Sequence, residues 1–164
     1  MTNLSMFCVT LEPNHKKFID ELGYIPVGVG EKNFNDLKGC LTDNSGNNIS
    51  EKNKNYGEYT FHYWLWKNYI DSPELQDGWF GFCQYRKFWS TNNKNLLPKT
   101  IDDLKPLTLK SIPESYKNFD VILGDPYYIN QFKPMKFFKK GFKIILENPS
   151  LLFKKEKRNL KFHF

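Results

Sequence analysis

The residues with the clearest chemical potential form two polar clusters that suit a phosphate ligand. Tyr85, Arg86 and Lys87 follow a predicted strand, 79–83, and so place a phenol and two cations at its carboxyl end. An Arg side chain binds phosphate through two parallel hydrogen bonds, and a Lys side chain adds a point charge. The second cluster, 42–53, is rich in Asn, Asp, Gly and Ser and precedes a predicted helix. Such a helix N-terminus favours an anion, although a solvated turn with a helix cap has the same composition.

Glu58 and His62 are candidates for acid–base chemistry, because their spacing of four places them on one face of the predicted helix. A carboxylate such as Glu58 has the chemistry to deprotonate or to bind a sugar hydroxyl. A lone His such as His62 is more typical of a packed, hydrogen-bonded core residue. Arg86 also has an alternative role, since it can pair with Glu58 or Asp43 instead of a ligand.

Several well-known site motifs are absent from the sequence. It has no Gly-x-Gly-x-x-Gly, no P-loop, no His-Glu-x-x-His and no paired Cys spacing for zinc. A strict Asp-x-Asp is absent as well, and Asp102-Asp103 lies in a polar segment that gives little support for a metal. We therefore predict no metal-ligating residue, and a divalent metal cofactor stays open.

The segments that must position these residues predict an α/β protein. Short apolar runs predict four strands, of which the last is followed by Asp125. A helix is expected from Ser50 onwards, with an aromatic stripe in 3-4-3-4 spacing as its core face. Strand, helix and strand in this order favour parallel pairing, in which ligands bind beyond the carboxyl ends of the strands. The strands are expected at 6–9, 24–30, 79–83 and 119–123, and the stripe consists of Tyr56, Tyr59, Tyr63, Trp66 and Ile70.

Length and composition favour a single core and a cytoplasmic protein. The chain has 164 residues and a mass of 19.5 kDa, and 40% of its residues are hydrophobic. It holds no run of about 20 apolar residues of the kind that spans a membrane. The N-terminus has no signal-peptide pattern, and three widely spaced Cys fit a reducing compartment better than a disulfide scaffold.

The net charge of +6 belongs to the end of the chain. Residues 1–130 hold 14 Lys and Arg against 16 Asp and Glu, whereas residues 131–164 hold 10 against 2. Within this segment, residues 132–146 predict an amphipathic helix that lies on the inner face of an anionic membrane, or that packs on the sheet and solvates its lysines. A coding bias towards Lys would raise the charge without any partner. The low Arg content argues against a nucleic-acid-binding module.

Three stretches of this sequence resemble a bacterial family catalogued as a domain of unknown function. They are 42–53 (TDNSGNNISEKN), Glu58 with 63–68 (YWLWKN), and 81–87 (GFCQYRK). The corresponding family patterns are D-N-T-G-D-N-I-S-E-K-N, E-L-T-x-x-Y-W-x-W-K-N and G-L-C-H-Y-R-R. Members are often labelled capsular polysaccharide synthesis proteins and are regarded as glycosyltransferases. The resemblance covers about residues 24–130 and is specific, because several rare runs coincide in order and spacing.

The resemblance implies a GT-A-like, Rossmann-like nucleotide-sugar-binding domain over residues 1–130, with a mixed sheet flanked by helices. The basic helical segment 131–164 would follow it. The implied activity is transfer of a sugar, galactofuranose being one example, from a nucleotide sugar to a growing capsule or lipopolysaccharide glycan. The donor is expected to be UDP-linked.

The same resemblance implies roles for individual residues. Arg86 would neutralise the diphosphate leaving group in place of a metal ion. Glu58, Asp43 or Asp125 would deprotonate the acceptor hydroxyl. The residues expected to bind the donor or the acceptor are Asn44, Asn48, Asn53, Gln84, Tyr85, Arg86 and Lys87.

The sequence departs from the family pattern at three positions. Asn47 stands in place of Asp, Gln84 in place of His, and Lys87 in place of the second Arg. The first two changes remove a carboxylate and an imidazole, and the chain is also expected to be shorter than most members. The alternative function is therefore an inactive or truncated relative that binds carbohydrate or nucleotide without turnover.

Overall fold

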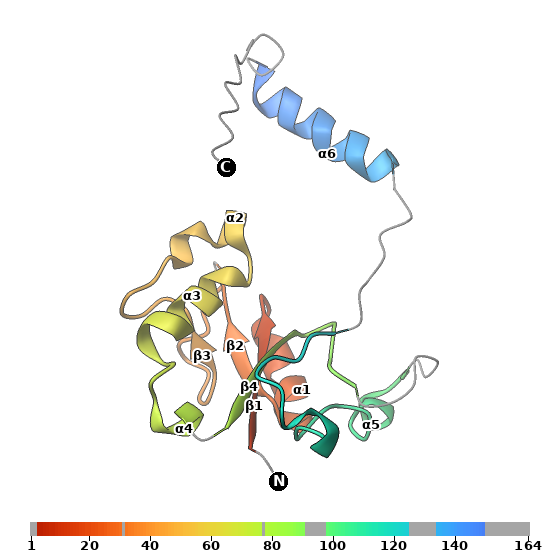
Figure 1. Ribbon diagram of the computed structural model, residues 1–164. Helices are drawn as coiled ribbons and strands as arrows, with labels where there is room; N and C mark the ends of the chain where they lie inside the picture. Colours follow the sequence, from red (N-terminus) through yellow and green to blue (C-terminus); the bar gives the residue numbers. More distant parts are fainter. Residues whose placement is uncertain (1–2, 31, 77, 91–97, 125–133, 150–164) are drawn as a thin grey trace, which may run out of the picture. The chain divides into compact units, whose positions relative to one another are not determined.

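The structure is a computed structural model, and it describes residues 3–30, 32–76, 78–90, 98–124 and 134–149. The chain divides into two compact units, Met1–Gly124 and Asp125–Phe164, and each is described by itself. The first unit holds the sheet and both predicted polar clusters, and the second holds a helix of the basic segment (Figure 1).

A four-stranded sheet forms the centre of the first unit. Its strands are β1 (Leu4–Thr10), β2 (Ile25–Gly28), β3 (Leu41–Thr42) and β4 (Trp79–Gln84), in the order β3-β2-β1-β4 (Figure 1). Every pairing among these strands is parallel, so the α/β class is confirmed, whereas the expected mixed sheet is not seen in the part that the structure describes. Parallel pairing brings all four carboxyl ends to one edge of the sheet.

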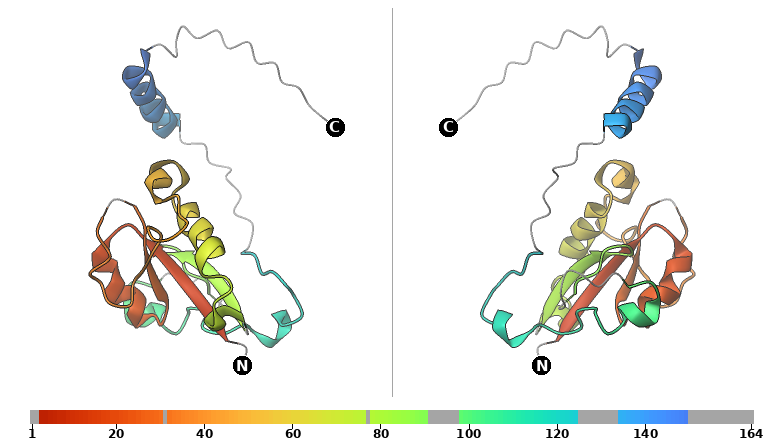
Figure 2. Two further views of the ribbon diagram at one scale, coloured as in Figure 1. Left: turned by 90° about the vertical axis from the view of Figure 1, so that its left-hand side faces the viewer. Right: turned by 90° about the vertical axis from the view of Figure 1, so that its right-hand side faces the viewer.

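Helices cover both faces of the sheet, as Figure 2 shows for α1 and α3. The α-helices are α1 (Lys16–Glu21), α2 (Asn53–Tyr56), α3 (Tyr59–Asn68), α4 (Pro73–Gln76), α5 (Ile101–Leu104) and α6 (Pro134–Glu147). Short 3-10 turns lie at Pro13–His15, Ser50–Lys52 and Glu114–Tyr116.

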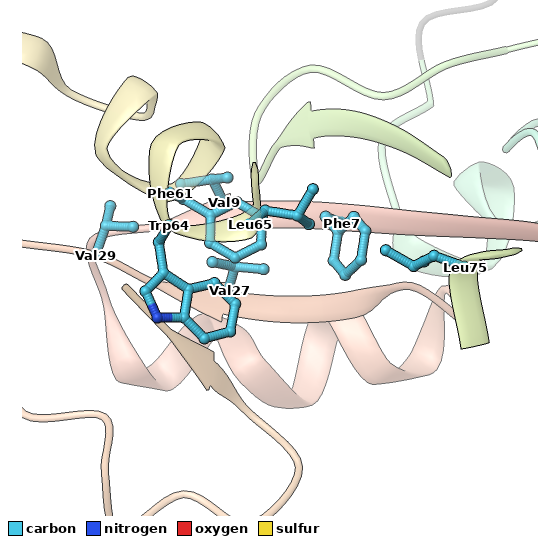
Figure 3. Packing of buried hydrophobic residues seen from close by; sticks show 8 residues of the cluster. All are labelled: Phe7, Val9, Val27, Val29, Phe61, Trp64, Leu65 and Leu75. Atoms are coloured by element: carbon cyan, nitrogen blue, oxygen red, sulfur yellow. The ribbon is translucent and has the colours of Figure 1, made fainter. Parts of the chain in front are cut away.

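The core follows the two-residue period of β1. Phe7 and Val9 face α3, while Met6 and Cys8 face α1, because successive side chains of a strand point to opposite faces. The cluster on the α3 side is shown in Figure 3 and consists of Phe7, Val9, Val27, Val29, Phe61, Trp64, Leu65 and Leu75. The cluster on the α1 side consists of Met6, Cys8, Ile19, Leu22, Tyr24 and Cys83.

The predicted aromatic stripe is wrong as a core face, although Ile70, its last member, packs against the buried cluster. Tyr59 and Trp66 are 63% and 57% exposed, whereas Phe61 and Leu65 are almost fully buried. The helix also breaks before α3, because Gly57 ends α2 with a φ of +57° that a glycine adopts most easily. Aromatic residues occur on every side of α3, so a 3-4-3-4 pattern fits more than one face. The buried face combines Phe61 and Leu65 with Trp64, whose indole N–H has a hydrogen-bond partner.

The predicted strand 119–123 is also wrong. This segment has no regular structure, and Val121 and Leu123 are 68% and 83% exposed. It lines an apolar groove of about 670 Å³ beside β4. A strand that pairs with β4 needs its outward-facing backbone groups, but the Phe82 carbonyl already accepts the Trp89 indole N–H at 2.8 Å. The sheet therefore ends at β4 among the described strands.

The basic segment contains the predicted helix as α6, so its helical character is confirmed over Pro134–Glu147. Residues 131–133 and 150–164 of the predicted segment lie outside the described residues. No helix in the described ranges is both long and apolar enough to span a bilayer. Contact of residues 132–146 with a membrane surface stays a prediction at this point.

Candidate active site

The candidate site lies at the carboxyl edge of the parallel sheet. Thr10 of β1 pairs with Gly28 of β2, which pairs with Thr42 of β3, so these three strands end at the same level. On the other side of β1, Val9 pairs with Gln84 of β4. The segments that follow β3 and β4 are the two polar clusters predicted from the sequence, and the structure brings them to one edge.

A tight turn after β4 presents the predicted phosphate ligands. The Lys87 N–H donates to the Gln84 carbonyl at 2.9 Å, and the Gln84 N–H donates back to the Lys87 carbonyl at 3.3 Å. Tyr85 and Arg86 therefore occupy the tip of the turn. Both Arg86 and Lys87 are exposed. In the described part of the chain Arg86 forms no ion pair with Glu58 or Asp43, which were its alternative partners, and its guanidinium lies 5.1 Å from the Tyr85 ring centroid.

A residue that the sequence analysis did not select supports this turn. The imidazole of His15 stacks on the Tyr85 ring, with 4.2 Å between the ring centroids and 22° between the planes. The Thr10 hydroxyl forms a hydrogen bond of 2.8 Å with His15 Nδ1. Thr10 is the last residue of β1, and His15 lies in the 3-10 turn that follows it. The rule that binding sites lie beyond the carboxyl ends of parallel strands would therefore have selected both residues.

Glu58 lies directly beside the end of β4. Its Oε1 accepts a hydrogen bond of 2.6 Å from the Gln84 side-chain amide, and the carboxylate is half-buried. One turn further along α3, the His62 ring packs on Phe82, with 4.1 Å between centroids. Burial lowers the pKa of His62, although the negative charge of Glu58 opposes this shift. His62 is thus a packed imidazole, as the sequence favoured, but its buried Nε2 has no hydrogen-bond partner among the described residues, contrary to the expectation of a hydrogen-bonded His. Glu58 is the accessible acid–base group.

Asp43 follows β3 and is the most buried carboxyl group of the site. Its side chain is 2% exposed, and its Oδ2 atom has no hydrogen-bond partner in the part of the chain that the structure describes. Burial raises the pKa of Asp43, and the nearby Thr60 hydroxyl opposes the shift. A buried carboxylate oxygen without a partner is costly, and such strain is typical of a site that binds a ligand.

Asn53 links the start of α3 to the loop after β2. Its amide donates to the Gly57 carbonyl at 2.8 Å and to the Thr60 hydroxyl at 3.0 Å. Its Oδ1 lies 3.2 Å from the position that a Cβ on Gly30 would occupy, and Gly30 has a φ of +88°. A side chain at this position would be strained and would press on Asn53, so glycine is required here.

The loop between β3 and the 3-10 turn is held by its own amides. Asn44 Oδ1 accepts from the Thr42 hydroxyl at 2.8 Å, and the Asn48 side chain bonds to Gly46 and Ser50. These bonds use much of the hydrogen-bonding capacity of Asn48 within the loop. A role of Asn44 and Asn48 in substrate binding stays a prediction, and the structure gives both a role in shaping the loop.

Asn68 is a second residue that the sequence analysis left without a role. Its side chain bonds to both the N–H and the carbonyl of Asn47, at 3.0 and 2.8 Å, and so fastens the loop to α3. The Trp64 indole N–H adds a bond of 2.9 Å to the Ser45 carbonyl. Two residues of the YWLWKN stretch in α3 therefore hold the loop that follows β3. The spacing of residues within this stretch does not predict these contacts.

No group of three or more His, Cys, Asp or Glu side chains with suitable geometry occurs within the described ranges. Asp125, the third candidate base, lies outside the described residues. The site that can be built from described groups therefore consists of two exposed cations, a half-buried carboxylate and a buried carboxyl group.

Comparison with known proteins gives one family. A family model described as a domain of unknown function (DUF4422) matches residues 9–147. No curated protein and no solved structure matches the chain. The matched range includes all the described groups of the candidate site.

A change at Asp43 is expected to alter the pH dependence of stability. Because its pKa is raised on folding, the native state holds this proton when the unfolded chain has lost it, so stability falls as the pH rises from 3.8 through the folded pKa. Asp43→Asn removes this pH-dependent loss of stability, because the amide does not titrate. The melting temperature of Asp43→Asn relative to wild type should therefore increase as the pH rises above about 4.

Asp71→Asn, at an exposed position, is the control for this pH series. Its melting temperature should follow that of wild type at each pH. If the melting temperature of Asp43→Asn differed from that of wild type by the same amount at every pH, folding would leave the pKa of Asp43 unchanged, and the interpretation of Asp43 as a strained site residue would be wrong.

Proposed function

The chain belongs to the DUF4422 family, and from that premise we propose that it is a glycosyltransferase acting on a nucleotide sugar. The observation that carries the proposal is the turn after β4, where Arg86 is exposed and lacks an ion-pair partner among the described residues. It lies at the carboxyl edge of a parallel sheet, the usual place for a nucleotide in this architecture. The GT-A-like fold and the capsule or lipopolysaccharide glycan as acceptor, which the sequence resemblance implies, are parts of this proposal.

The proposed reaction divides the work between the cations and a carboxylate. The acceptor oxygen forms a bond to the anomeric carbon of the sugar, and the bond from that carbon to the diphosphate breaks. Arg86 and Lys87 stabilise the charge that develops on the leaving nucleoside diphosphate. Glu58 accepts the proton of the acceptor hydroxyl, because it is more accessible than Asp43.

A second candidate function is supported by one contact. The Gln84 amide donates to Glu58 at 2.6 Å, and a Gln cannot carry a proton as the family's usual His can. A protein that binds the nucleotide sugar or a carbohydrate without turnover would have this arrangement. Binding and turnover must therefore be measured separately.

Loss of Arg86 is the direct test of nucleotide binding. We expect UDP and UDP-galactose to bind the wild-type protein in isothermal titration calorimetry, and Arg86→Ala to weaken binding about tenfold to one hundredfold. A hydrogen bond to a charged group contributes about 1.5–3 kcal/mol, which corresponds to this range. Arg86→Lys should fall between the two, because Lys keeps the charge but loses the paired geometry.

Lys54→Ala is the matched control, since it removes an exposed cation from the same unit. It should leave the affinity for UDP unchanged. Titrations in EDTA and in manganese determine whether a metal contributes. If folded wild-type protein bound neither UDP nor UDP-galactose, or if Arg86→Ala bound them equally well, the proposal would be wrong.

A further inference from the structure

We propose that α6 lies in the interface of an anionic membrane, with its lysines towards the lipid headgroups and its apolar side towards the acyl chains. The inference goes beyond the proposed transfer reaction and does not depend on it. It rests on the distribution of side chains around α6, on their exposure, on charge and on length.

The apolar side of α6 is unusually wide. At about 100° per residue, its described apolar residues span an arc of about 200°, from Ile144 round to Leu146. A helix that packs one face on a soluble core needs an apolar stripe of about 100° or more. The arc of α6 covers about half of the helix, which suits a helix that lies in a membrane interface with its apolar half towards the acyl chains. Its described members are Met135, Phe138, Phe142, Ile144, Ile145 and Leu146.

Both edges of this arc are exposed. Ile144 at one edge is 51% exposed, and Met135 and Leu146 near the other edge are each 69% exposed. Phe142, between them, is 68% exposed. Contiguous exposed apolar residues of this size mark an interaction surface more often than an ordinary protein surface.

The remaining side of α6 carries lysines, whose positive charge favours an anionic membrane as the partner. Lys139 and Lys143 are exposed there, and Glu147 lies 3.7 Å from the Lys143 ammonium. Residues 131–164 hold 10 Lys and Arg against 2 Asp and Glu, so this part of the chain is strongly cationic. Anionic lipids attract such a segment, and a nucleic acid would use the lysines but not the wide apolar arc.

The length of α6 fixes how it would meet the bilayer. Its 14 residues extend about 21 Å at 1.5 Å per residue, whereas a spanning helix must cross about 30 Å of hydrocarbon. A short amphipathic helix with aromatic and aliphatic residues opposite lysines lies parallel to the membrane surface.

Vesicle flotation of the full chain, without nucleotide, tests this inference. We expect the wild-type protein to float with vesicles of phosphatidylglycerol and phosphatidylcholine, to float less at high salt, and to bind pure phosphatidylcholine weakly. Lys139→Glu with Lys143→Glu should weaken binding by about tenfold or more. Phe142→Ser with Leu146→Ser should weaken binding to a similar extent.

Two matched double variants control these measurements. Lys38→Glu with Lys54→Glu changes the net charge equally at exposed positions of the first unit, and Val121→Ser with Leu123→Ser removes equally exposed apolar side chains there. Both should bind vesicles as the wild type does.

Three outcomes would overturn the proposal. The wild-type protein fails to float, the α6 variants float as well as their controls, or pure phosphatidylcholine binds as strongly as the anionic vesicles. If the wild-type protein fails to float, light scattering and thermal melts of the same variants identify what covers the apolar side of α6 instead of a membrane. A dimer that Phe142→Ser with Leu146→Ser dissociates indicates a second copy, and a lowered melting temperature without dimerisation indicates that α6 packs on its own chain.

Discussion

Phe61→Ala is expected to lower the free energy of unfolding by about 3–5 kcal/mol, whereas Trp66→Ala on the same helix should change it by less than about 0.5 kcal/mol. Phe61 is 0% exposed and packs against Phe7 and Phe82, with ring centroids 5.5 and 6.3 Å apart. Its removal leaves a cavity between α3 and the sheet. Trp66 is 57% exposed, and its ring is covered by the Lys67 ammonium at 3.4 Å instead of the core.

Urea denaturation of the full chain, followed by circular dichroism, measures both changes. The pair is a sharp test because each substitution removes an aromatic side chain from the same helix, and the two positions are five residues apart. A large loss in Trp66→Ala together with a small loss in Phe61→Ala would show that α3 buries the other face. The aromatic stripe predicted from the sequence would then be correct after all.

The orientation of α3 shows why the sequence predicted the helix but not its buried face. Periodicity identifies a face when polar residues occupy the other side, and α3 has aromatic residues around its whole circumference. The decisive information is tertiary: β1 and β2 supply Phe7 and Val27 as the surface on which Phe61 packs. The spacing of residues within α3 therefore cannot identify which face is buried.

The segment 119–123 was mispredicted for a related reason. An apolar run of strand length predicts a strand only if a neighbouring strand has backbone groups free to pair with it. Trp89 donates its indole N–H to the Phe82 carbonyl on that edge of β4, and the apolar run 119–123 itself contains no sign of this contact. The strands 6–9, 24–30 and 79–83, by contrast, were predicted because their partners are each other.

The place where the two polar clusters meet was predicted better than the core face, whereas the roles of their residues stay predictions. Asp43 and the segment 84–87 follow from the rule that ligands bind at the carboxyl ends of parallel strands, and the register of the sheet brings these ends together. Asn68 was missed because its role depends on a contact with Asn47, 21 residues away in the sequence. His15 lies just beyond β1, so the same rule applied to that strand would have found it.

Glu58→Gln is expected to reduce the rate of sugar transfer by about one hundredfold to ten thousandfold, if the chain turns over its donor. The amide keeps the size of the side chain but cannot accept the acceptor's proton. The affinity for UDP should stay unchanged, because the proposed diphosphate contacts belong to Arg86 and Lys87. Glu74→Gln, at an exposed position in α4 outside both polar clusters, is the matched control and should keep the wild-type rate.

The rate is measured as UDP released from UDP-galactose or UDP-galactofuranose in the presence of glycan, beside the calorimetric affinity of each variant. An unchanged rate in Glu58→Gln together with inactive Asp43→Asn would assign the base to the buried carboxyl group. Wild-type protein that binds the nucleotide sugar and releases no UDP would instead favour the binding protein without turnover. If the wild-type protein is inactive, Gln84→His tests whether Gln84 is the reason. This variant restores the imidazole of the family pattern beside Glu58. A gain of activity would show that the Gln84 amide, 2.6 Å from Glu58, keeps the site inactive and that the remaining groups suffice for catalysis.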